Sequence, residues 1–143
     1  MPFKKSQSAG YLANHMARLF ANGLHQRIRP LGLAPAQFMT LIELWTDDGL
    51  TQADLVERLD VEQATMANTL KRMERDGLIE RRPHPDDKRA QQNWLTTKAI
   101  NLEKPATAAA NAQNAVALQN LTPQERRTFL KFMAAVIGAM RTH

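Results

Sequence analysis

The sequence contains no cysteine among its 143 residues, and this absence excludes several kinds of chemistry. Disulfides, thiolate nucleophiles and thiol-based redox sensing all require that side chain. Long apolar runs are also missing: no segment approaches the roughly 18 residues of a membrane span, and the start of the chain lacks the apolar core of a signal peptide. We therefore expect a cytoplasmic protein with no membrane partner.

Motifs for catalysis and for cofactor binding are absent as well. The chain has no phosphate-cradling glycine loop and no Ser, His and Asp set around a nucleophile turn. Asp86 and Asp87 resemble a catalytic pair only in composition, because adjacent acids in a hairpin are nearly always turn formers. The histidines show no metal-ligand spacing; they are His15, His25, His84 and His143. The sequence predicts no enzyme, no cofactor and no metal site.

Acidic residues are missing from residues 1–42, so the charge of the chain is unevenly distributed. In total 19 basic residues outweigh 14 acidic ones, which gives a formal net charge of +5. An excess of this sign favours a polyanionic partner, such as nucleic acid or an anionic membrane surface. The informative basic cluster comprises Lys71, Arg72, Arg75, Arg81, Arg82, Lys88 and Arg89.

Hydrophobic periodicity predicts a mainly α-helical chain with a small β-wing. Helices are expected over residues 10–29, 35–46, 51–59, 63–76 and 96–120, and from residue 122 onward. Thr51, Thr96 and Thr122 are suited to cap three of these helices, and Pro105 is expected to kink or restart the fifth. After Gly77 the pattern becomes extended and predicts two strands, over residues 78–82 and 92–95.

No internal repeat and no long linker divides the chain, so residues 1–143 are predicted to form a single domain. Its third and fourth helices are short, are joined by a tight turn, and are followed at once by the two-stranded wing. These are the parts of a winged helix-turn-helix, which we expect over residues 33–96. A helix of this kind fits the major groove of DNA, and a basic wing tip reaches the neighbouring minor groove.

The fourth helix has one apolar stripe, Met66, Leu70 and Met73, which we expect to face the core. The candidate DNA contacts lie outside that stripe and are Gln63, Thr65, Asn68 and Arg72. Gln and Asn pair bidentately with adenine, Thr contacts the thymine methyl group, and Arg72 is better placed for a backbone phosphate. The alternative is that these polar residues form only a solvated face.

The segment from Leu59 to Ala99, LDVEQATMANTLKRMERDGLIERRPHPDDKRAQQNWLTTKA, resembles the MarR family and most closely its SlyA branch. Asp87, Lys88 and Arg89 are similar to the family's Asp-x-Arg motif, in which the acid holds the arginine for the minor groove. The resemblance implies a sequence-specific double-stranded DNA-binding transcription regulator, with repression as the expected sign. This chain departs from common family residues at His84 and at Asn68, which puts the wing-loop geometry and the operator sequence in question.

The resemblance also implies a homodimer on a pseudo-palindromic operator, with helices of residues 1–32 and 97–143 as the dimerisation region. A dimer doubles the few base contacts that one recognition helix offers. The apolar faces of the first and sixth helices would form the seam between the two copies. Alternatively, these helices close the core of a monomer.

A small phenolic or aromatic effector is a further implication of the resemblance, bound between the dimerisation helices and the DNA-binding lobe. In that topology the candidate contacts are His15, Arg18, Met39 and Trp45. Each has a structural alternative, because a Met or Trp at helical spacing usually belongs to the core and an arginine is usually solvated or paired.

A winged-helix module that holds a partner protein is the alternative function. Such a module needs no basic wing, so Arg81, Arg82, Lys88 and Arg89 favour DNA. Salt distinguishes the two functions, because DNA binding weakens steeply as ionic strength rises.

Overall fold

A computed structural model of the chain describes residues 2–142. Its helices are α1 (Ala9–Ile28), α2 (Pro35–Thr46), α3 (Gln52–Leu59), α4 (Gln63–Arg75), α5 (Thr97–Ala117) and α6 (Pro123–Arg141). Its strands are β1 (Leu50–Thr51), β2 (Ile79–Pro83) and β3 (Gln91–Leu95), and short 3-10 turns occupy Lys5–Gln7 and Arg29–Leu31. Within these residues, no helix has the length and apolar character needed to cross a bilayer.

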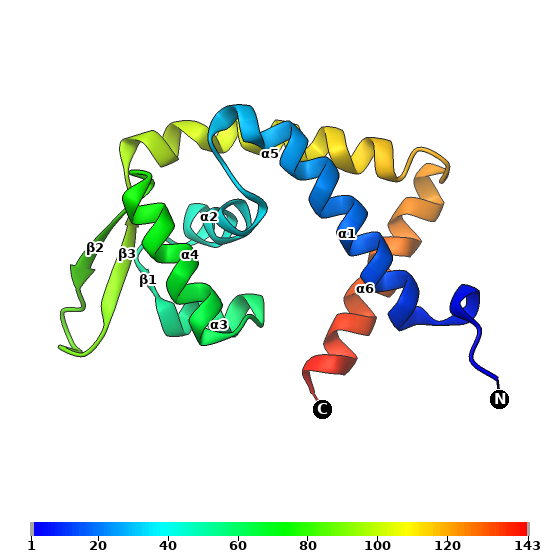
Figure 1. Cartoon of the computed structure of the whole chain (residues 1–143), viewed down its shortest axis with the longest axis horizontal. Coiled ribbons are helices and arrows are strands. Elements are labelled where there is room, and N and C mark those ends of the chain that lie inside the picture. Colours follow the sequence, from blue (N-terminus) through cyan, green and yellow to red (C-terminus); the bar gives the residue numbers. More distant parts are fainter. Residues whose placement is uncertain (1, 143) are drawn as a thin grey trace.

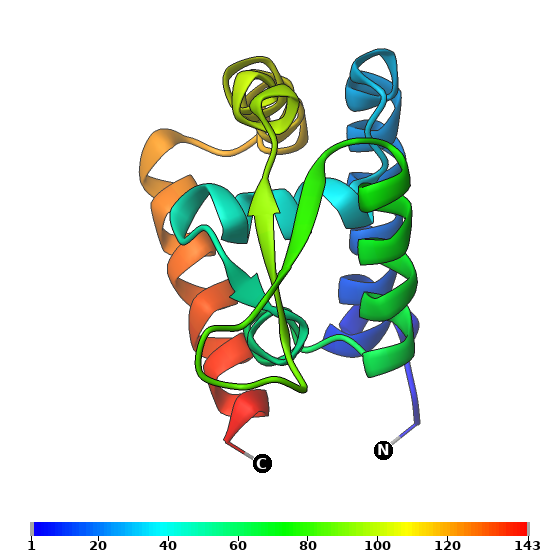
Figure 2. The same ribbon diagram turned by 90° about the vertical axis from the view of Figure 1, so that its left-hand side faces the viewer.

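The elements divide into a DNA-binding-type lobe and the arms, which are the helices α1, α5 and α6 (Figure 1). The lobe contains α2, α3, α4 and the three strands, and α5 leaves it to run along the top of the molecule. Helix α1 packs against α5, and α6 descends from the far end of α5, on the opposite side from α1 in the view of Figure 2. Figure 2 shows the strands in front, with α5 seen end-on above them. This arrangement confirms the predicted winged helix-turn-helix with additional terminal helices.

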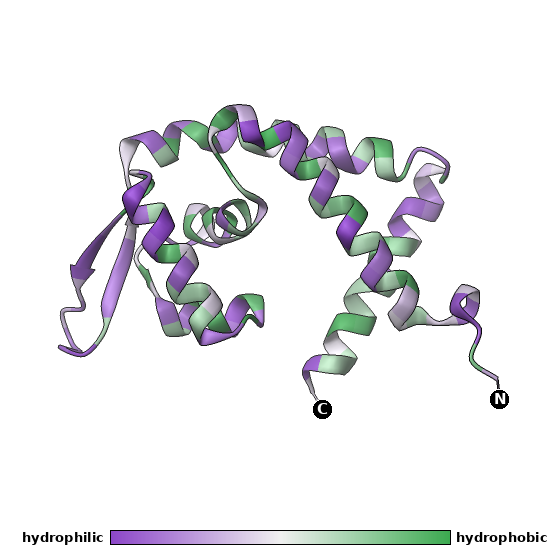
Figure 3. Ribbon diagram, in the orientation of Figure 1, coloured by the Kyte–Doolittle hydropathy of each residue, from purple (hydrophilic) through white to green (hydrophobic). Residues whose placement is uncertain are grey.

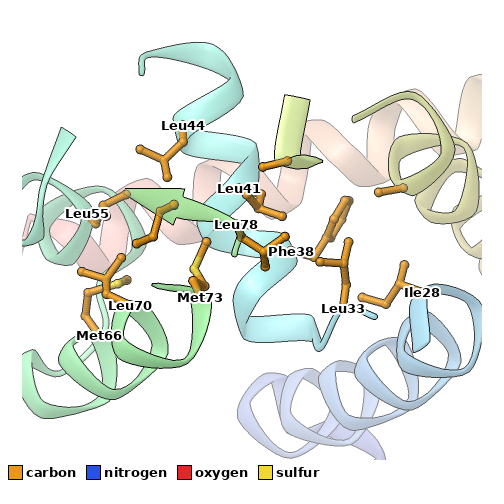
Figure 4. Packing of buried hydrophobic residues seen from close by; sticks show 13 residues of the cluster. Ile28, Leu33, Phe38, Leu41, Leu44, Leu55, Met66, Leu70, Met73 and Leu78 are labelled. Atoms are coloured by element: carbon orange, nitrogen blue, oxygen red, sulfur yellow. The ribbon is translucent and has the colours of Figure 1, made fainter. Parts of the chain in front are cut away.

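One apolar cluster holds the lobe together (Figure 4). Helix α4 contributes Met66, Leu70 and Met73, each at most 2% exposed, and the predicted inward stripe is therefore confirmed. Helix α2 contributes a facing set, which includes Leu41 and Leu44, both fully buried. Burying one such side chain stabilises the fold by about 1.5–3 kcal/mol. Because the stripe can face only this cluster, the opposite side of α4 is turned outward.

The sheet has the strand order β1-β3-β2, and both pairings are antiparallel. The wing strands were predicted to within one residue at each end, but β1 was missed. Two residues cannot show a period of alternation, so Leu50–Thr51 carries no strand pattern. Their pairing with β3 is reinforced by Asn93, whose side-chain amide donates to the Leu50 carbonyl at 3.0 Å. Strand β1 thus ties the start of α3 to the wing.

The end of α4 is fixed by a group of hydrogen bonds around Asp76. Gln37, a buried residue of α2, donates from Nε2 to Asp76 Oδ2 at 2.9 Å, and Lys98 of α5 donates from Nζ to the Asp76 carbonyl at 2.8 Å. Gly77 then takes a φ of +74°, a conformation that favours glycine and turns the chain into β2. These contacts join the recognition helix to the helices on either side of it.

The predicted helix caps are confirmed. The hydroxyls of Thr51, Thr96 and Thr122 each accept a backbone N–H three residues later, at 3.2 Å in all three cases. The expected restart at Pro105 is wrong, because α5 is continuous through that residue. A proline removes one helical hydrogen bond. We attribute the continuity to the burial of Ala99 and Ala106, which anchors α5 to the rest of the fold on both sides of the proline.

Helix α6 differs from the other α-helices in having no buried residue. Its apolar side chains Leu130, Phe132, Val136, Ile137 and Met140 are all more than half exposed. Figure 3 shows this green apolar band on α6 and the contrasting purple, polar wing. A hollow of about 640 Å3 with an apolar lining lies between α6 and α1.

Replacing Gln37 tests whether the Asp76 group stabilises the lobe. We expect Gln37→Ala to lower the free energy of unfolding by about 1.5–3 kcal/mol, the cost of removing a part-buried hydrogen bond to a charged group. Urea denaturation at fixed protein concentration measures this change. The control Gln119→Ala, at an exposed position after α5, should change stability by no more than about 0.5 kcal/mol. Equal stability of the two variants would contradict the assigned role of Gln37.

Candidate nucleic-acid interface

The outward face of α4 presents the four polar residues singled out in the sequence. Gln63, Thr65, Asn68 and Arg72 are all exposed. Thr69 lies between them in sequence but is buried, and its hydroxyl donates to the Thr65 carbonyl at 3.0 Å. Packing of the lobe therefore sorts the polar residues of α4 into those that reach solvent and one that does not.

A contact between α3 and α4 orients the start of the recognition helix. Gln52, the first residue of α3, donates from Nε2 to the Gln63 carbonyl at 3.3 Å and to Gln63 Oε1 at 3.1 Å. The N-cap residue Glu62 makes no side-chain capping hydrogen bond. The first backbone N–H groups of α4 are thus left free of a side-chain cap at the end that would meet DNA first.

The tip of the wing is closed by its own hydrogen bonds. Backbone bonds join His84 N to the Ala90 carbonyl and Ala90 N to the Asp87 carbonyl, each at 3.1 Å. The ring of His84 accepts the Asp86 N–H at Nδ1, at 3.0 Å. His84, where this chain departs from the common family residue, therefore helps to hold the turn of the wing loop.

Asp87 holds the residue that follows the wing turn. Its Oδ1 accepts the backbone N–H of Arg89 at 3.0 Å and lies 3.8 Å from Arg89 Nε. The Arg89 side chain is 95% exposed and projects from the tip. The acid thus shapes the turn while the guanidinium stays free to reach a ligand, as the resemblance to the Asp-x-Arg motif implies.

Positive charge remains unneutralised on the side of the lobe that carries α4 and the wing. Arg75 and Arg82 are paired with Asp76 and Glu80 at 3.0 and 3.3 Å. By contrast, Lys71, Arg72 and Lys88 form no ion pair within residues 2–142. These free cations flank the outward face of α4 and the wing tip, where a polyanion would bind.

The four candidate effector contacts are spread over different parts of the protomer. His15 lines the apolar hollow between α1 and α6, and Arg18 is exposed on α1. Met39 lines a separate cavity of about 130 Å3 between α2 and α4. Trp45 packs edge-on against Phe38, and its Nε1 donates to the Ala99 carbonyl at 3.1 Å. The structure therefore gives Trp45 a packing role.

No three His, Cys, Asp or Glu side chains come together to hold a metal ion in the part of the chain that the structure describes. His143 lies outside the described residues.

Arg81 occupies a distinct position that was not predicted from the sequence. It was grouped with the exposed basic residues of the wing, but its Nε and Nη2 atoms are buried and have no hydrogen-bond partner in residues 2–142. The available signal was strand alternation, which places Arg81 on the same face as the buried Ile79 and Arg82 on the other face.

Comparisons with known proteins agree with this geometry. The sequence matches the MarR family over residues 33–90. A helix-turn-helix transcriptional regulator of Bacillus subtilis is 36% identical over 86 residues, which are 60% of this chain and 62% of that protein. A helix-turn-helix transcriptional repressor of Mycobacterium tuberculosis is 27% identical over 124 residues, 87% of this chain and 89% of the relative.

A solved structure with operator DNA is also similar. It is a mutant MarR from E. coli complexed with operator DNA, with a TM-score of 0.82 and 26% sequence identity, covering 89% of this chain and 91% of that chain. The matched fold, the helix-turn-helix relatives and the family match lead to one conclusion. Residues 33–90, which include the winged helix-turn-helix, match the MarR family, and the chain has the fold of MarR-type helix-turn-helix transcriptional regulators.

Proposed function

We propose that the protein represses transcription by binding a pseudo-palindromic operator in double-stranded DNA as a homodimer. The observation that carries this proposal is the exposed face of α4 beside the basic wing tip. Polar side chains suited to base reading are exposed on α4, and the Arg89 side chain at the wing tip is 95% exposed. The E. coli relative complexed with operator DNA supports the same partner for this chain.

Each part of that surface has a role in DNA binding. With α4 in the major groove, Gln63, Thr65 and Asn68 reach base edges, and Arg72, farther along the helix, reaches a phosphate. Arg89 enters the adjacent minor groove, where its permanent charge is attracted by the negative potential of a narrow groove, and Lys88 supports it. Asp87 keeps the turn that presents both of them.

The arms support the homodimer. An isolated protomer would leave the apolar band of α6 and the hollow against α1 in water. Monomeric proteins rarely expose so continuous an apolar surface. A second copy related by a two-fold axis would cover both surfaces with the same surfaces of its own. The alternative of a closed monomeric core is disfavoured because no residue of α6 is buried.

Repression follows from occupancy, since a dimer across a promoter blocks polymerase without further machinery. The mycobacterial relative is itself named a repressor, which supports repression by this chain.

For a small phenolic or aromatic effector, the support is the cavity at Met39, whose volume of about 130 Å3 is near the ~150 Å3 that accommodates a benzene ring. This cavity lies behind α4, so a ligand there would press on the recognition helix.

Loss of the wing-tip arginine tests the minor-groove contact. We expect Arg89→Ala to weaken binding to a labelled duplex from upstream of the protein's own gene by about tenfold or more, because a charge-assisted contact is lost. Fluorescence anisotropy with excess nonspecific competitor measures the affinity. The control Arg127→Ala removes the same charge from an exposed position of α6 and should bind as the wild type does.

Two outcomes would contradict these assignments. Wild-type affinity in Arg89→Ala would remove Arg89 from the interface. If the wild-type protein binds neither this duplex nor any sequence from an unbiased selection, the DNA-binding proposal fails and the protein-interaction module becomes the better hypothesis.

Asn68 tests base reading within α4. We expect Asn68→Ala to change sequence preference at one position of each half-site by about 1–3 kcal/mol, the value of one bidentate base contact. Lys71→Ala is the control, because loss of a nearby exposed charge should weaken binding to all sequences equally. Selection from a randomised duplex library gives the preferences, and identical preferences in the wild type and Asn68→Ala would show that Asn68 reads no base.

A charge within the apolar band of α6 tests the dimer. We expect Ile137→Glu to convert the dimer to a monomer and to weaken operator binding, because a buried carboxylate at the seam would be unpaired. Analytical ultracentrifugation measures the mass in solution. Lys131→Glu adds a carboxylate on the other face of α6 and should leave the dimer intact. A dimeric Ile137→Glu variant would place the interface elsewhere.

A further inference from the structure

A polar pocket separates the recognition helix from the wing. Its volume is about 510 Å3, and it is bounded by the start of α3, the start of α4 and the inner face of β2 and β3. The side chains that matter here are Thr51, Gln52, Gln63, Arg81, Lys88 and Arg89. No acidic residue lines the pocket.

Arg81 brings a charge to the floor of this pocket. The antiparallel register places Arg81 opposite Asn93, which is 1% exposed. Arg81 Nε and Nη2 and Asn93 Oδ1 are buried and have no hydrogen-bond partner within residues 2–142. Arg81 as a whole is half-buried, and burial of two of its guanidinium nitrogens without a counter-charge is costly. The cost falls if an anion enters the pocket.

The start of α3 adds to the positive potential. The first backbone N–H groups of a helix have no partner within the helix, and they carry the positive end of its dipole. Gln52 and Ala53, the first two residues of α3, both line the pocket. The carboxylate of Asp54, in the first turn of α3, accepts the Thr51 N–H at 3.0 Å and does not line the pocket.

The path of the DNA backbone identifies a phosphate as the anion that would enter this pocket. If α4 lies in the major groove and the wing tip in the adjacent minor groove, the strand that separates those grooves must pass between them. The pocket occupies this interval, with Gln63 of α4 on one side and Arg89 of the wing on the other. Only the sugar-phosphate backbone separates the major groove from the minor groove, so a phosphate is the group of the DNA that would face the pocket.

We propose that this pocket binds a phosphate of the DNA strand between the two grooves, and that Arg81 is the cation that pairs with it. The inference rests on the proposed DNA-binding function and adds a contact to it. Arg81 then fixes the register of the duplex between α4 and the wing without reading a base. Lys88 and the start of α3 complete the phosphate site.

Two adjacent arginines allow a matched test. Arg81→Gln removes the inward charge, whereas Arg82→Gln removes an outward charge that is stacked over Trp94 on the opposite face of the strand. We expect Arg81→Gln to weaken binding to operator and random duplexes by a similar factor of about tenfold, and to reduce the slope of log affinity against log salt by about 0.9. Arg82→Gln should keep the wild-type slope. An unchanged slope in Arg81→Gln would overturn the inference.

Uncharged backbone linkages in the DNA identify the phosphate that Arg81 contacts. Methylphosphonate linkages are placed one at a time in the operator strand between the grooves, and binding of the wild type and Arg81→Gln is compared. We expect one linkage to cost the wild type about tenfold and Arg81→Gln nothing further, because the same contact is already lost. Equal costs at every linkage in both proteins would refute a phosphate contact by Arg81.

The outcomes separate this inference from the proposed function. If the wild type binds no DNA, both fail; if it binds DNA and Arg81→Gln matches it in affinity and slope, only the phosphate site fails. Circular dichroism melting verifies that Arg81→Gln is folded. If Arg81→Gln does not fold, Arg81→Lys replaces it. This variant keeps the charge, so the salt slope should stay at the wild-type value. The loss of affinity caused by the methylphosphonate linkage should become smaller, because lysine lacks the guanidinium fork. A wild-type methylphosphonate cost in Arg81→Lys would overturn the inference in that case.

Discussion

Burial of one stripe of α4 is the constraint on which the remaining structure depends. Met66, Leu70 and Met73 pack into the cluster shared with α2 and the sheet, and this fixes the rotation of the helix about its own axis. A helix has only one such orientation, so the residues opposite the stripe must face outward. The hydrogen bonds of Asp76 to α2 and α5 then fix the end of the helix. The proposed DNA contacts of α4 depend on this support, because a small rotation of the helix would move every one of them.

Strand pairing likewise decides which side chains of the wing face the lobe and which face outward. Antiparallel pairing with β3 sends alternate residues of β2 to opposite faces, so two neighbouring arginines have different environments. Arg82 lies over Trp94 on the outside, whereas Arg81 is directed into the lobe. The short strand β1 joins the start of α3 to the same sheet. The recognition helix, the first helix of the motif and the wing therefore form one frame, in which polar groups of all three line one pocket.

The arms connect the lobe to a second copy of the chain in the proposed dimer. Helix α5 begins at the end of the wing and reaches the apolar region of α1 and α6, so the seam and the recognition helix are joined by a continuous element. A second connection comes from the end of α6, where Arg141 donates to the Glu57 carbonyl at 2.8 Å and pairs with Asp60 at 3.0 Å. In such an arrangement, a change at the seam alters the separation of the two recognition helices. That separation decides whether both half-sites can be bound together.

The sequence by itself determined the helices, their caps and the wing, because periodicity and capping are local properties. The sequence also identified the exposed polar residues of α4, because residues outside the apolar stripe are expected to face solvent. Strand β1 and the continuity of α5 through Pro105 depended on partners distant in sequence: β3 for the strand, and the buried packing of Ala99 and Ala106 for the helix. The partial burial of Arg81 and the pocket that it lines likewise required the tertiary structure. A pattern of charges shows that a surface is basic, but only the packing of three separate segments decides which cation is enclosed and left without a partner.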